Sequence, residues 1–464
     1  MSFTSFAFFI FIGVFFSIWY FLRNRREGRW FLLTVASFFF YGWWDWKFLG
    51  LLIATGLFDF ILALTIDRTK GDNKRLILMC FSVISNLTVL ALFKYTVFFS
   101  NNFEELGQYF GWNVSLTSNI PSVFLVLPIG ISFYTFESLS YTIDVYHRHI
   151  KPTKNVFQYF AFLSMFPRLV AGPIERPANL LPQLERNPQP SNEMVWKGFN
   201  LILAGYFKKL VIADNLAPYV NEAFARTHSV SGLSWWIAMF SFSIQIYCDF
   251  SGYSDIARGL ANLLGFEFKL NFNSPYISHG FSDFWRRWHI SLSSWFRDYL
   301  YIPLGGSKVS KIRSHLNTWI TMLVSGFWHG ASWTFVAWGA LHAMFLSFEH
   351  EVRWHQKINK HLVVLITFLM VTFAWVLFRA ESLQQAKNIY LAMLTLSGGD
   401  NLISLKQIFL ILLALVPHLY EFSKSKTAIE QYYPTRLVKI VMATMIVFCI
   451  FGRGPGSTFI YFQF

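Results

Sequence analysis

The chain has 464 residues, of which 54% are hydrophobic, 20% aromatic and only 14% charged, with a mean hydropathy of +0.41. This is too little polar surface to cover a water-soluble globule of this length, so composition excludes an ordinary soluble domain and predicts a membrane protein. The formal charge of +14 comes from short basic clusters between apolar runs. Such clusters are typical of cytoplasmic loops, and they argue against a nucleic-acid partner.

The apolar runs predict an all-α polytopic membrane protein with about 11 spans. Several runs are shorter than the roughly 20 residues that cross a bilayer, so we expect tilted, broken, re-entrant or interfacial helices among them. The predicted spans are residues 4–22, 30–44, 47–66, 76–99, 123–141, 232–248, 316–331, 334–348, 361–379, 405–418 and 436–452.

The charged segments predict the orientation of the first helices. The apolar run 4–22 is followed, not preceded, by RNRREGR, which indicates a retained helix with its N-terminus outside rather than a cleavable signal peptide. The basic segments 67–75 and 147–155 are expected in the cytoplasm. Segment 101–122 has no Lys or Arg and is expected outside.

Between residues 156 and 220 the hydropathy is ambiguous, because short apolar pieces alternate with the proline-rich stretch PRLVAGPIERPANLLPQLERNPQP. Such backbone is tolerated at membrane depth only inside protein or beside a cavity. We expect a re-entrant loop or surface helices here, on the cytoplasmic side. No repeat or linker divides the chain, which predicts one domain over 1–464, with N-terminal helices (1–120), a catalytic core (121–380) and C-terminal helices (381–464).

Polar and charged residues that need an explanation in an apolar chain are densest in the stretch SDFWRRWHISLSSWFRDYLYIPLGG (282–306). As one helix it would stack Trp285 over His289 and pair Asp283 with Arg287, before Pro303 and two glycines end it. It would then line a cavity or lie at the membrane interface. The sequence favours neither of two roles for His289: a residue of the functional site, or an anchor at the membrane surface.

Two carboxylates follow the apolar run 235–247, in the segment YCDFSGYSDIARG. Asp249 and Asp255 need hydrogen bonds or a cavity at that depth. They orient a histidine, or Ser254 and Asp255 cap the next helix.

His329 lies in SGFWHGASW (325–333), where the surroundings are apolar and Gly326 and Gly330 leave room for close approach. These surroundings distinguish it from the other eleven histidines. An ionisable side chain inside a membrane is costly and marks a functional site by default. A neutral imidazole suits general-base activation of a hydroxyl. The alternative is a structural histidine bonded to a backbone carbonyl.

Motifs for several enzyme classes are missing from the sequence: there is no GxSxG elbow, no GxxxxGK[ST] loop and no HExxH zinc site. Seven segments together resemble the membrane-bound O-acyltransferase (MBOAT) family, most of all its AlgI-like branch of alginate and exopolysaccharide O-acetyltransferases. Residues 1–120 match only in hydropathy. The segments are PIGISFYTFESLSYTIDVY (128–146), FPRLVAGPIERP (166–177), DFSGYSDIARGL (249–260), DFWRRWHISLSSWFRDYLYIPLGG (283–306), SGFWHGASWTFVAWG (325–339), FAWVLFRA (373–380) and FIYFQF (459–464).

The resemblance implies a bundle with a funnel on each side, meeting at a catalytic histidine, here His329, with His289 as a second catalytic position. An acyl group, by preference acetyl, passes from a cytoplasmic thioester such as acetyl-CoA to a hydroxyl, with no metal and no tightly bound cofactor. His329 would be the base and His289 would orient a reactant. The substrate-binding candidates, of which Trp328 or Ser325 would stabilise the oxyanion, are Trp328, Ser325, Asp249, Asp255, Arg286 and Trp285.

The same resemblance implies a multi-pass protein of the bacterial cytoplasmic (inner) membrane, in contact with lipids. The acceptor would be a polysaccharide, and a separate periplasmic SGNH-type acetyltransferase or export partner would complete the transfer, since the chain has no such domain. Three alternatives remain: D-alanyl transfer to teichoic acid, acylation of a lipid or sterol, and a transporter without chemistry. The absence of an internal duplication disfavours the transporter.

Overall fold

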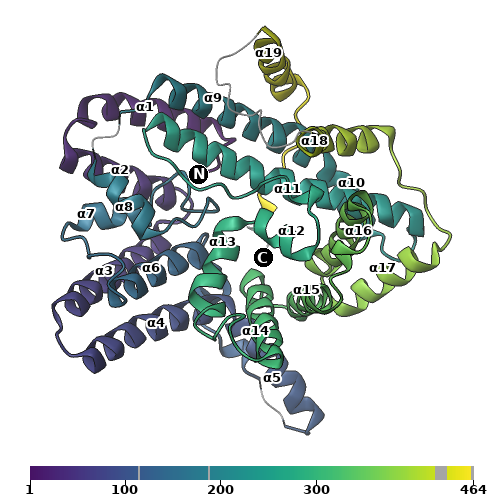
Figure 1. The fold of residues 1–464 in the computed structure, drawn as a ribbon, viewed down its shortest axis with the longest axis horizontal. Coiled ribbons are helices and arrows are strands. Elements are labelled where there is room, and N and C mark those ends of the chain that lie inside the picture. The colour runs from purple at the N-terminus through teal and green to yellow at the C-terminus, as the bar shows by residue number, and fades with distance from the viewer. Residues whose placement is uncertain (113–114, 187–188, 424–435, 461–464) are drawn as a thin grey trace. The chain divides into compact units, whose positions relative to one another are not determined.

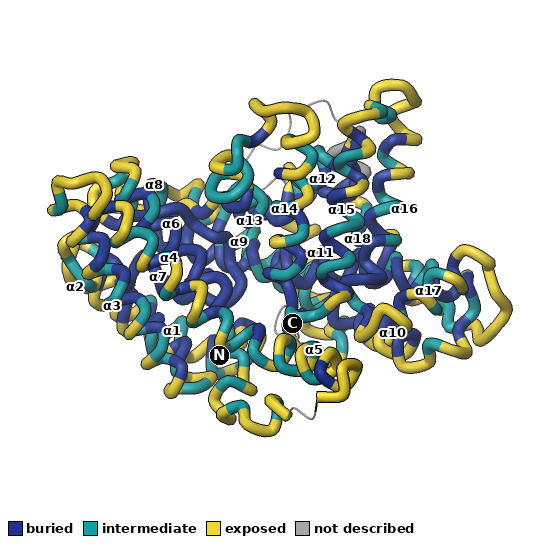
Figure 2. The backbone as a smooth tube through the Cα atoms, turned by 90° about the horizontal axis from the view of Figure 1, so that it is seen from below, coloured by how far each residue is buried: buried dark blue, intermediate teal, exposed yellow. Residues whose placement is uncertain are grey.

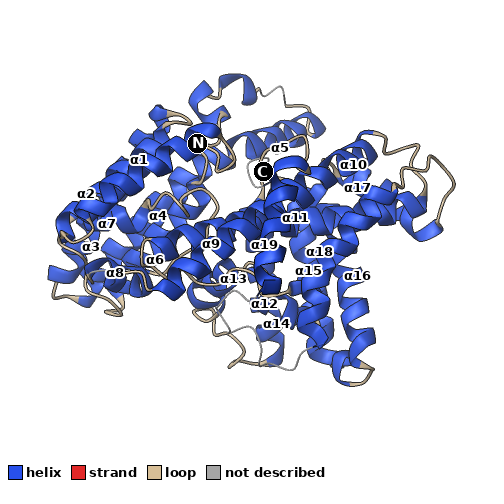
Figure 3. Cartoon of the chain, turned by 90° about the horizontal axis from the view of Figure 1, so that it is seen from above, coloured by secondary structure: helices blue, strands red, loops and turns tan. Residues whose placement is uncertain are grey.

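The computed structural model describes residues 1–464 except 113–114, 187–188, 424–435 and 461–464, and it leaves out the side chains of 419–438. Within these described ranges every regular element is helical, as Figure 3 shows. The one β-bridge recorded there joins Val230 to Asp400. The predicted all-α class is therefore confirmed.

The chain folds into two compact units, described separately here. Unit 1 comprises Met1–Val195 with Leu260–Phe268, and unit 2 comprises Trp196–Gly259 with Lys269–Phe464. The predicted single domain and its three parts stay a prediction.

Unit 1 contains the first eight α-helices and two short 3-10 turns. Side-chain caps begin some of them: Ser5 caps the first helix and Asp45 the third. The elements are α1 (Phe6–Leu22), α2 (Arg26–Gly42), α3 (Trp46–Arg68), α4 (Asp72–Lys94), α5 (Thr96–Tyr109), η1 (Thr117–Asn119), η2 (Ser122–Leu125), α6 (Ile131–Tyr146), α7 (Val156–Leu163) and α8 (Pro177–Glu185).

Two predicted spans of unit 1 are broken in the structure. The predicted span 76–99 is divided at Tyr95, where α4 ends and α5 begins, so the expected exterior loop 101–122 starts as a helix. The predicted span 123–141 becomes a 3-10 turn followed by α6, because Gly130 has φ +75° and a Cβ there would lie 2.7 Å from the Leu169 carbonyl oxygen. Hydropathy does not register such local backbone breaks.

The proline-rich segment lies inside unit 1, since all residues from 158 to 177 are buried. Figure 2 shows dark blue tube around α6 and α7. Within it the buried Arg168 forms an ion pair with the buried Glu137. Irregular backbone in this segment was expected to be enclosed by protein, and it is. The expected position of the segment on the cytoplasmic side of the membrane stays a prediction.

Unit 2 contains the remaining helices, two of them with π-helical turns. The elements are α9 (Asn192–Tyr206, its first turn in unit 1), η3 (Phe207–Ala213), α10 (Asp214–Ala225), α11 (Gly232–Leu263, its last turn in unit 1), η4 (Pro275–Ile277), α12 (Phe281–Arg287), α13 (Ile290–Phe296), η5 (Arg297–Tyr301), α14 (Lys311–His329), α15 (Trp333–Val352), η6 (Trp354–Gln356), α16 (Lys360–Arg379), α17 (Leu383–Thr395), α18 (Leu405–Ser423) and α19 (Arg436–Phe451).

Helices α14 and α15 form a tight antiparallel pair, which is visible in Figure 1. Their backbones touch at glycines: a Cβ at Gly326 would collide with the Phe335 carbonyl oxygen, and one at Gly339 with the Met322 carbonyl oxygen. Small residues at a helix crossing allow this approach. The crossing fixes the end of α14, and so His329, against the first half of α15.

Three described helices are long and apolar enough to cross a membrane by length and composition: α3, α4 and α16. The shorter apolar helices Phe6–Leu22, Leu405–His418 and Lys439–Phe451 accompany them. The predicted count of about 11 spans is therefore not confirmed.

Candidate functional site

His329 is the last residue of α14 and is only 4% exposed. Its Nδ1 lies 2.7 Å from the carbonyl oxygen of Ser325, one turn earlier. Because a carbonyl only accepts, a neutral imidazole donates from Nδ1 and carries its lone pair on Nε2. A hydrogen bond to a backbone carbonyl was the mark of a purely structural histidine. In this position the same bond leaves Nε2 unprotonated, which is the tautomer that a general base requires.

His289 joins α12 to α13 and is fully buried. Its backbone is left-handed, with φ +41°, so the predicted continuous helix over this segment is wrong. Its Nδ1 lies 3.1 Å from Oδ1 of Asn271, which also accepts from the Ser291 hydroxyl at 2.9 Å. The amide of Asn271 donates in turn to Ser254 on α11 at 3.2 Å. His289 is thus held from several elements and is not a surface anchor.

Trp328 brings the two histidines together. Its ring centroid lies 5.1 Å from that of His329 and 6.4 Å from that of His289. Phe250 closes the other side of His289 at 4.6 Å. The structure therefore places His329, His289, Trp328 and Ser325 in one buried cluster of unit 2, and their roles in a site stay predictions.

Trp285 and Arg286 diverge from that prediction. Trp285 does not stack over His289, because α12 ends at Arg287; it packs instead on Trp338 at 5.7 Å and on His342 at 5.1 Å. Arg286 has a side chain that is 72% exposed and lies 3.7 Å from Asp283. The predicted pair of Asp283 with Arg287 is confirmed at 2.9 Å.

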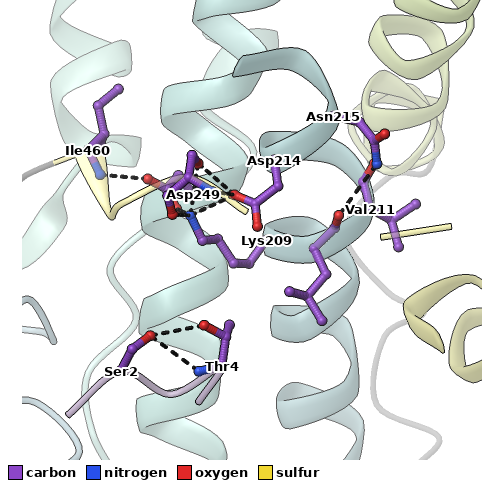
Figure 4. Close-up of polar contacts among 10 residues, drawn as sticks. Ser2, Thr4, Lys209, Val211, Asp214, Asn215, Asp249 and Ile460 are labelled. Atoms are coloured by element: carbon purple, nitrogen blue, oxygen red, sulfur yellow. Dashed lines mark hydrogen bonds and ion pairs between the residues drawn. The ribbon is translucent and has the colours of Figure 1, made fainter. Parts of the chain in front are cut away.

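Asp249 belongs to a buried charge network, drawn in Figure 4. Lys209 Nζ lies 2.9 Å from Asp249 and 2.8 Å from Asp214, and Asp249 accepts the backbone N–H of Ile460 at 2.7 Å. Ser457 donates its hydroxyl to Asp214 at 2.6 Å. These contacts anchor the chain near its C-terminus to α11 and to the start of α10, and the recorded partners of Asp249 are not histidines.

Asp255 pairs with Lys208 at 2.6 Å and with Arg258 at 3.5 Å. The alternative that Ser254 and Asp255 cap a new helix is wrong, because both lie inside α11, which continues to Leu263. These ion pairs explain how carboxylates are tolerated in an apolar helix.

Sequence reasoning missed His342 and wrongly set His329 apart from all the other histidines. His342 lies in the apolar run WTFVAWGALHAMF of α15 and is fully buried, and His418 on α18 is also buried. The rule that flagged His329, an ionisable residue in an apolar helix, applies equally to His342. Asn271 and Lys209 carried no such signal, because their partners are far away in sequence.

One group in the described part of the chain has metal-ligating residues close together: His315, His350 and Glu351, whose ligand atoms lie within 4.8 Å of one another. Lys311 already pairs with Glu351 at 2.5 Å. His315 is 14 residues before His329, or about 21 Å along a helix, so this group is not part of the histidine cluster.

Comparison with known proteins extends the resemblance over most of the chain. The model of the membrane-bound O-acyltransferase family (MBOAT) matches residues 1–383, including the first 120. A Pseudomonas aeruginosa protein named "Probable alginate O-acetylase AlgI" is 41% identical over 400 residues, covering 85% of this chain and 75% of that protein.

Two other similar proteins carry names with different acceptors or acyl groups. The peptidoglycan O-acetyltransferase of Helicobacter pylori is 36% identical over 397 residues, covering 79% of this chain and 74% of that protein. The teichoic acid D-alanyltransferase of Streptococcus thermophilus is 30% identical over 246 residues, covering 50% of this chain and 59% of that protein.

Proposed function

Because this chain belongs to the membrane-bound O-acyltransferase family, and so is a membrane O-acyltransferase, we propose that it transfers acetyl groups to an exopolysaccharide. The two relatives that cover most of this chain are named as an alginate O-acetylase and a peptidoglycan O-acetyltransferase, and both names describe O-acetyl transfer. D-alanyl transfer is the weaker candidate, since that relative covers half of this chain. Because the family is one of acyltransferases, we do not propose a transporter without chemistry.

The observation that carries the mechanism is the bond from His329 Nδ1 to the Ser325 carbonyl. With that tautomer, Nε2 takes the proton of the acceptor hydroxyl as the oxygen attacks the thioester carbon. The new C–O ester bond forms, the C–S bond breaks, and the imidazolium returns its proton to the leaving thiolate. His289, held by Asn271, orients a reactant beside Trp328.

We propose a cytoplasmic thioester, acetyl-CoA by preference, as the donor. A pocket of about 270 Å³ lies along α14, and its lining includes Arg297, His315, His350 and several hydroxyls. It reaches Met322, seven residues before His329, and starts near the basic N-terminus of α14. Such a lining suits a phosphate-bearing donor. No metal and no tightly bound cofactor enters this scheme.

The remaining parts of the proposal concern the membrane and the partner. The chain would be multi-pass in the bacterial cytoplasmic (inner) membrane, with about 11 spans and a funnel on each side of the histidines. Between α1 and α2 an apolar groove of about 410 Å³ suits contact with lipid chains. A periplasmic SGNH-type acetyltransferase or export protein would complete transfer to the polysaccharide.

The test is the O-acetyl content of the surface polysaccharide in a deletion strain. The strain is restored with wild type, His329→Ala, or His228→Ala as a control at an exposed histidine, all at matched membrane abundance. Loss of a general base lowers the rate about 10²–10⁴-fold, so we expect esters with wild type and the control only. Esters with His329→Ala would contradict the catalytic role, and D-alanyl esters that follow the gene would replace acetyl transfer. Esterified lipid in place of polysaccharide would favour the lipid acceptor.

A further inference from the structure

Buried N–H groups without a hydrogen-bond partner gather beside His329. Among the residues that the structure describes, this holds for the indole N–H groups of Trp285, Trp338 and Trp375. Neither ring nitrogen of His342 has a partner there, and one of the two carries the N–H of the neutral ring. A buried donor without a partner loses its hydrogen bond to water and gains none in return, so such groups in native proteins need an explanation. A bound polar ligand is one.

These side chains form one aromatic group around Trp338. Its ring centroid lies 5.1 Å from His329, 4.8 Å from His342, 5.7 Å from Trp285 and 5.8 Å from Trp375. Trp338 and His342 are four residues apart on α15, hence on one face, and both are fully buried. The glycine crossing of α14 and α15 holds this face against the end of α14.

Two indoles elsewhere in the described part of the chain show what a partnered indole looks like. Trp30 donates to the Leu184 carbonyl at 2.9 Å, and the half-buried Trp236 donates to the Met393 carbonyl at 3.1 Å. Trp235 and Trp354 also lack one within the described ranges, so a lone unpaired indole does not mark a site. What marks the place beside His329 is that several unpaired indole N–H groups and a second buried imidazole occur together there.

We infer that Trp338 and His342 are substrate-contact residues whose N–H groups hydrogen-bond the carbonyl oxygen of the acyl group undergoing transfer. This inference rests on the proposed acyl transfer. The carbonyl oxygen becomes an oxyanion as the hydroxyl adds, and an indole N–H and a neutral imidazole N–H strengthen their bonds to it at that moment. Trp328 and Ser325, for which the sequence predicted the oxyanion role, lie in the same cluster and stay predictions.

The first variant to test is His342→Phe, which keeps a ring in the aromatic group and removes both nitrogens. Removing one oxyanion donor slows such reactions about 10²–10³-fold, so we expect the O-acetyl content of cells to fall at least about tenfold. The melting temperature of the purified chain should stay level or rise, because the lost nitrogens had no partner in the protein. His342→Gln retains an N–H donor and should keep more activity than His342→Phe.

Trp338→Phe and Trp236→Phe form the matched pair. Each removes one indole N–H from unit 2, but Trp236 packs on Phe240 and donates to the Met393 carbonyl. We expect Trp338→Phe to lose esters and Trp236→Phe to keep them within about twofold.

Normal ester levels in both His342→Phe and Trp338→Phe would overturn the inference. So would an ester loss in His342→Phe that only follows reduced abundance or a lower melting temperature. If wild type and Trp236→Phe form no O-acetyl ester either, the proposed function itself fails, which separates the two failures.

Discussion

His289 has the left-handed backbone that favours glycine, with φ +41° and ψ 53°. A side chain with a Cβ costs about 1–2 kcal/mol in this conformation. We therefore expect His289→Gly to unfold at a higher temperature than His289→Ala, although both remove the imidazole and lower acyl transfer. Differential scanning fluorimetry in detergent measures the difference.

Arg353 provides the control for that pair, because it also has a left-handed backbone, with φ +49°, and is exposed. Arg353→Gly should likewise be more stable than Arg353→Ala, with acyl transfer retained in both. Equal melting temperatures for the two His289 variants would show that the backbone there relaxes without strain.

The residues of the site differ in how far sequence could predict them. His329 was found because an imidazole in an apolar run needs a functional explanation, and its partner Ser325 is one turn away. The partners of Asp249 were not found, since Lys209 is 40 positions earlier and Ile460 is 211 later. Spacing along a helix reveals neighbours three or four residues apart and nothing beyond them.

At the scale of elements, the crossing of α14 and α15 depends on small residues. Gly326→Ala places a methyl group against the backbone oxygen of Phe335, so the helices must separate. We expect a loss of about 1–3 kcal/mol in stability, the usual cost of overpacking, together with reduced acyl transfer. Gly13→Ala in α1 is the control, because nothing lies within 4 Å of a Cβ there. A melting temperature unchanged by Gly326→Ala would contradict the tight crossing.

The link between α5 and η1 should depend on pH. The backbone N–H and hydroxyl of Thr117 donate to Glu104, at 2.7 and 2.8 Å, and hold the pKa of this carboxyl below its ordinary value. A lowered pKa stabilises the folded link above the unfolded pKa, near 4.3, and the effect is lost as pH falls through the folded value.

Hydrogen exchange of residues 115–119 checks this. Glu104→Gln should exchange faster than wild type at pH 7, and the difference should shrink with falling pH and disappear once the pH lies below the lowered pKa of Glu104, where wild type is protonated as well. A difference that persists at low pH would mean that the carboxylate charge is not what holds the link.

Helix boundaries were predicted well where an apolar run ends at polar residues. The spans expected at 47–66 and 361–379 correspond to α3 (Trp46–Arg68) and α16 (Lys360–Arg379). The predictions failed at Tyr95, Gly130 and His289, where the backbone turns inside an apolar or amphipathic run. A non-glycine residue with positive φ, such as His289, has no composition signal that hydropathy detects.

At the scale of the whole molecule, the charged loops predict which parts of the chain face the cytoplasm. With Cys80, Cys248 and Cys449 replaced by Ser, single cysteines report the side of each loop. A membrane-impermeant maleimide should label Ser118→Cys in intact cells, and Lys70→Cys and Lys151→Cys only after permeabilisation. Labelling of all three in intact cells would contradict the proposed topology.

The network around Lys209 has a consequence for how the protein is made. Asp249 leaves the ribosome 211 residues before Ile460, whose N–H it accepts, and Asp214 precedes Ser457 by 243 residues. At 5–20 residues per second, about 10–40 seconds pass between the synthesis of Asp249 and that of Ile460. During that interval Lys209 is present, but the two carboxylates lack the hydrogen bonds that Ile460 and Ser457 donate in the finished chain. A chain released before residue 457 would therefore leave both buried carboxylates short of hydrogen-bond donors, at a cost that the finished chain does not carry.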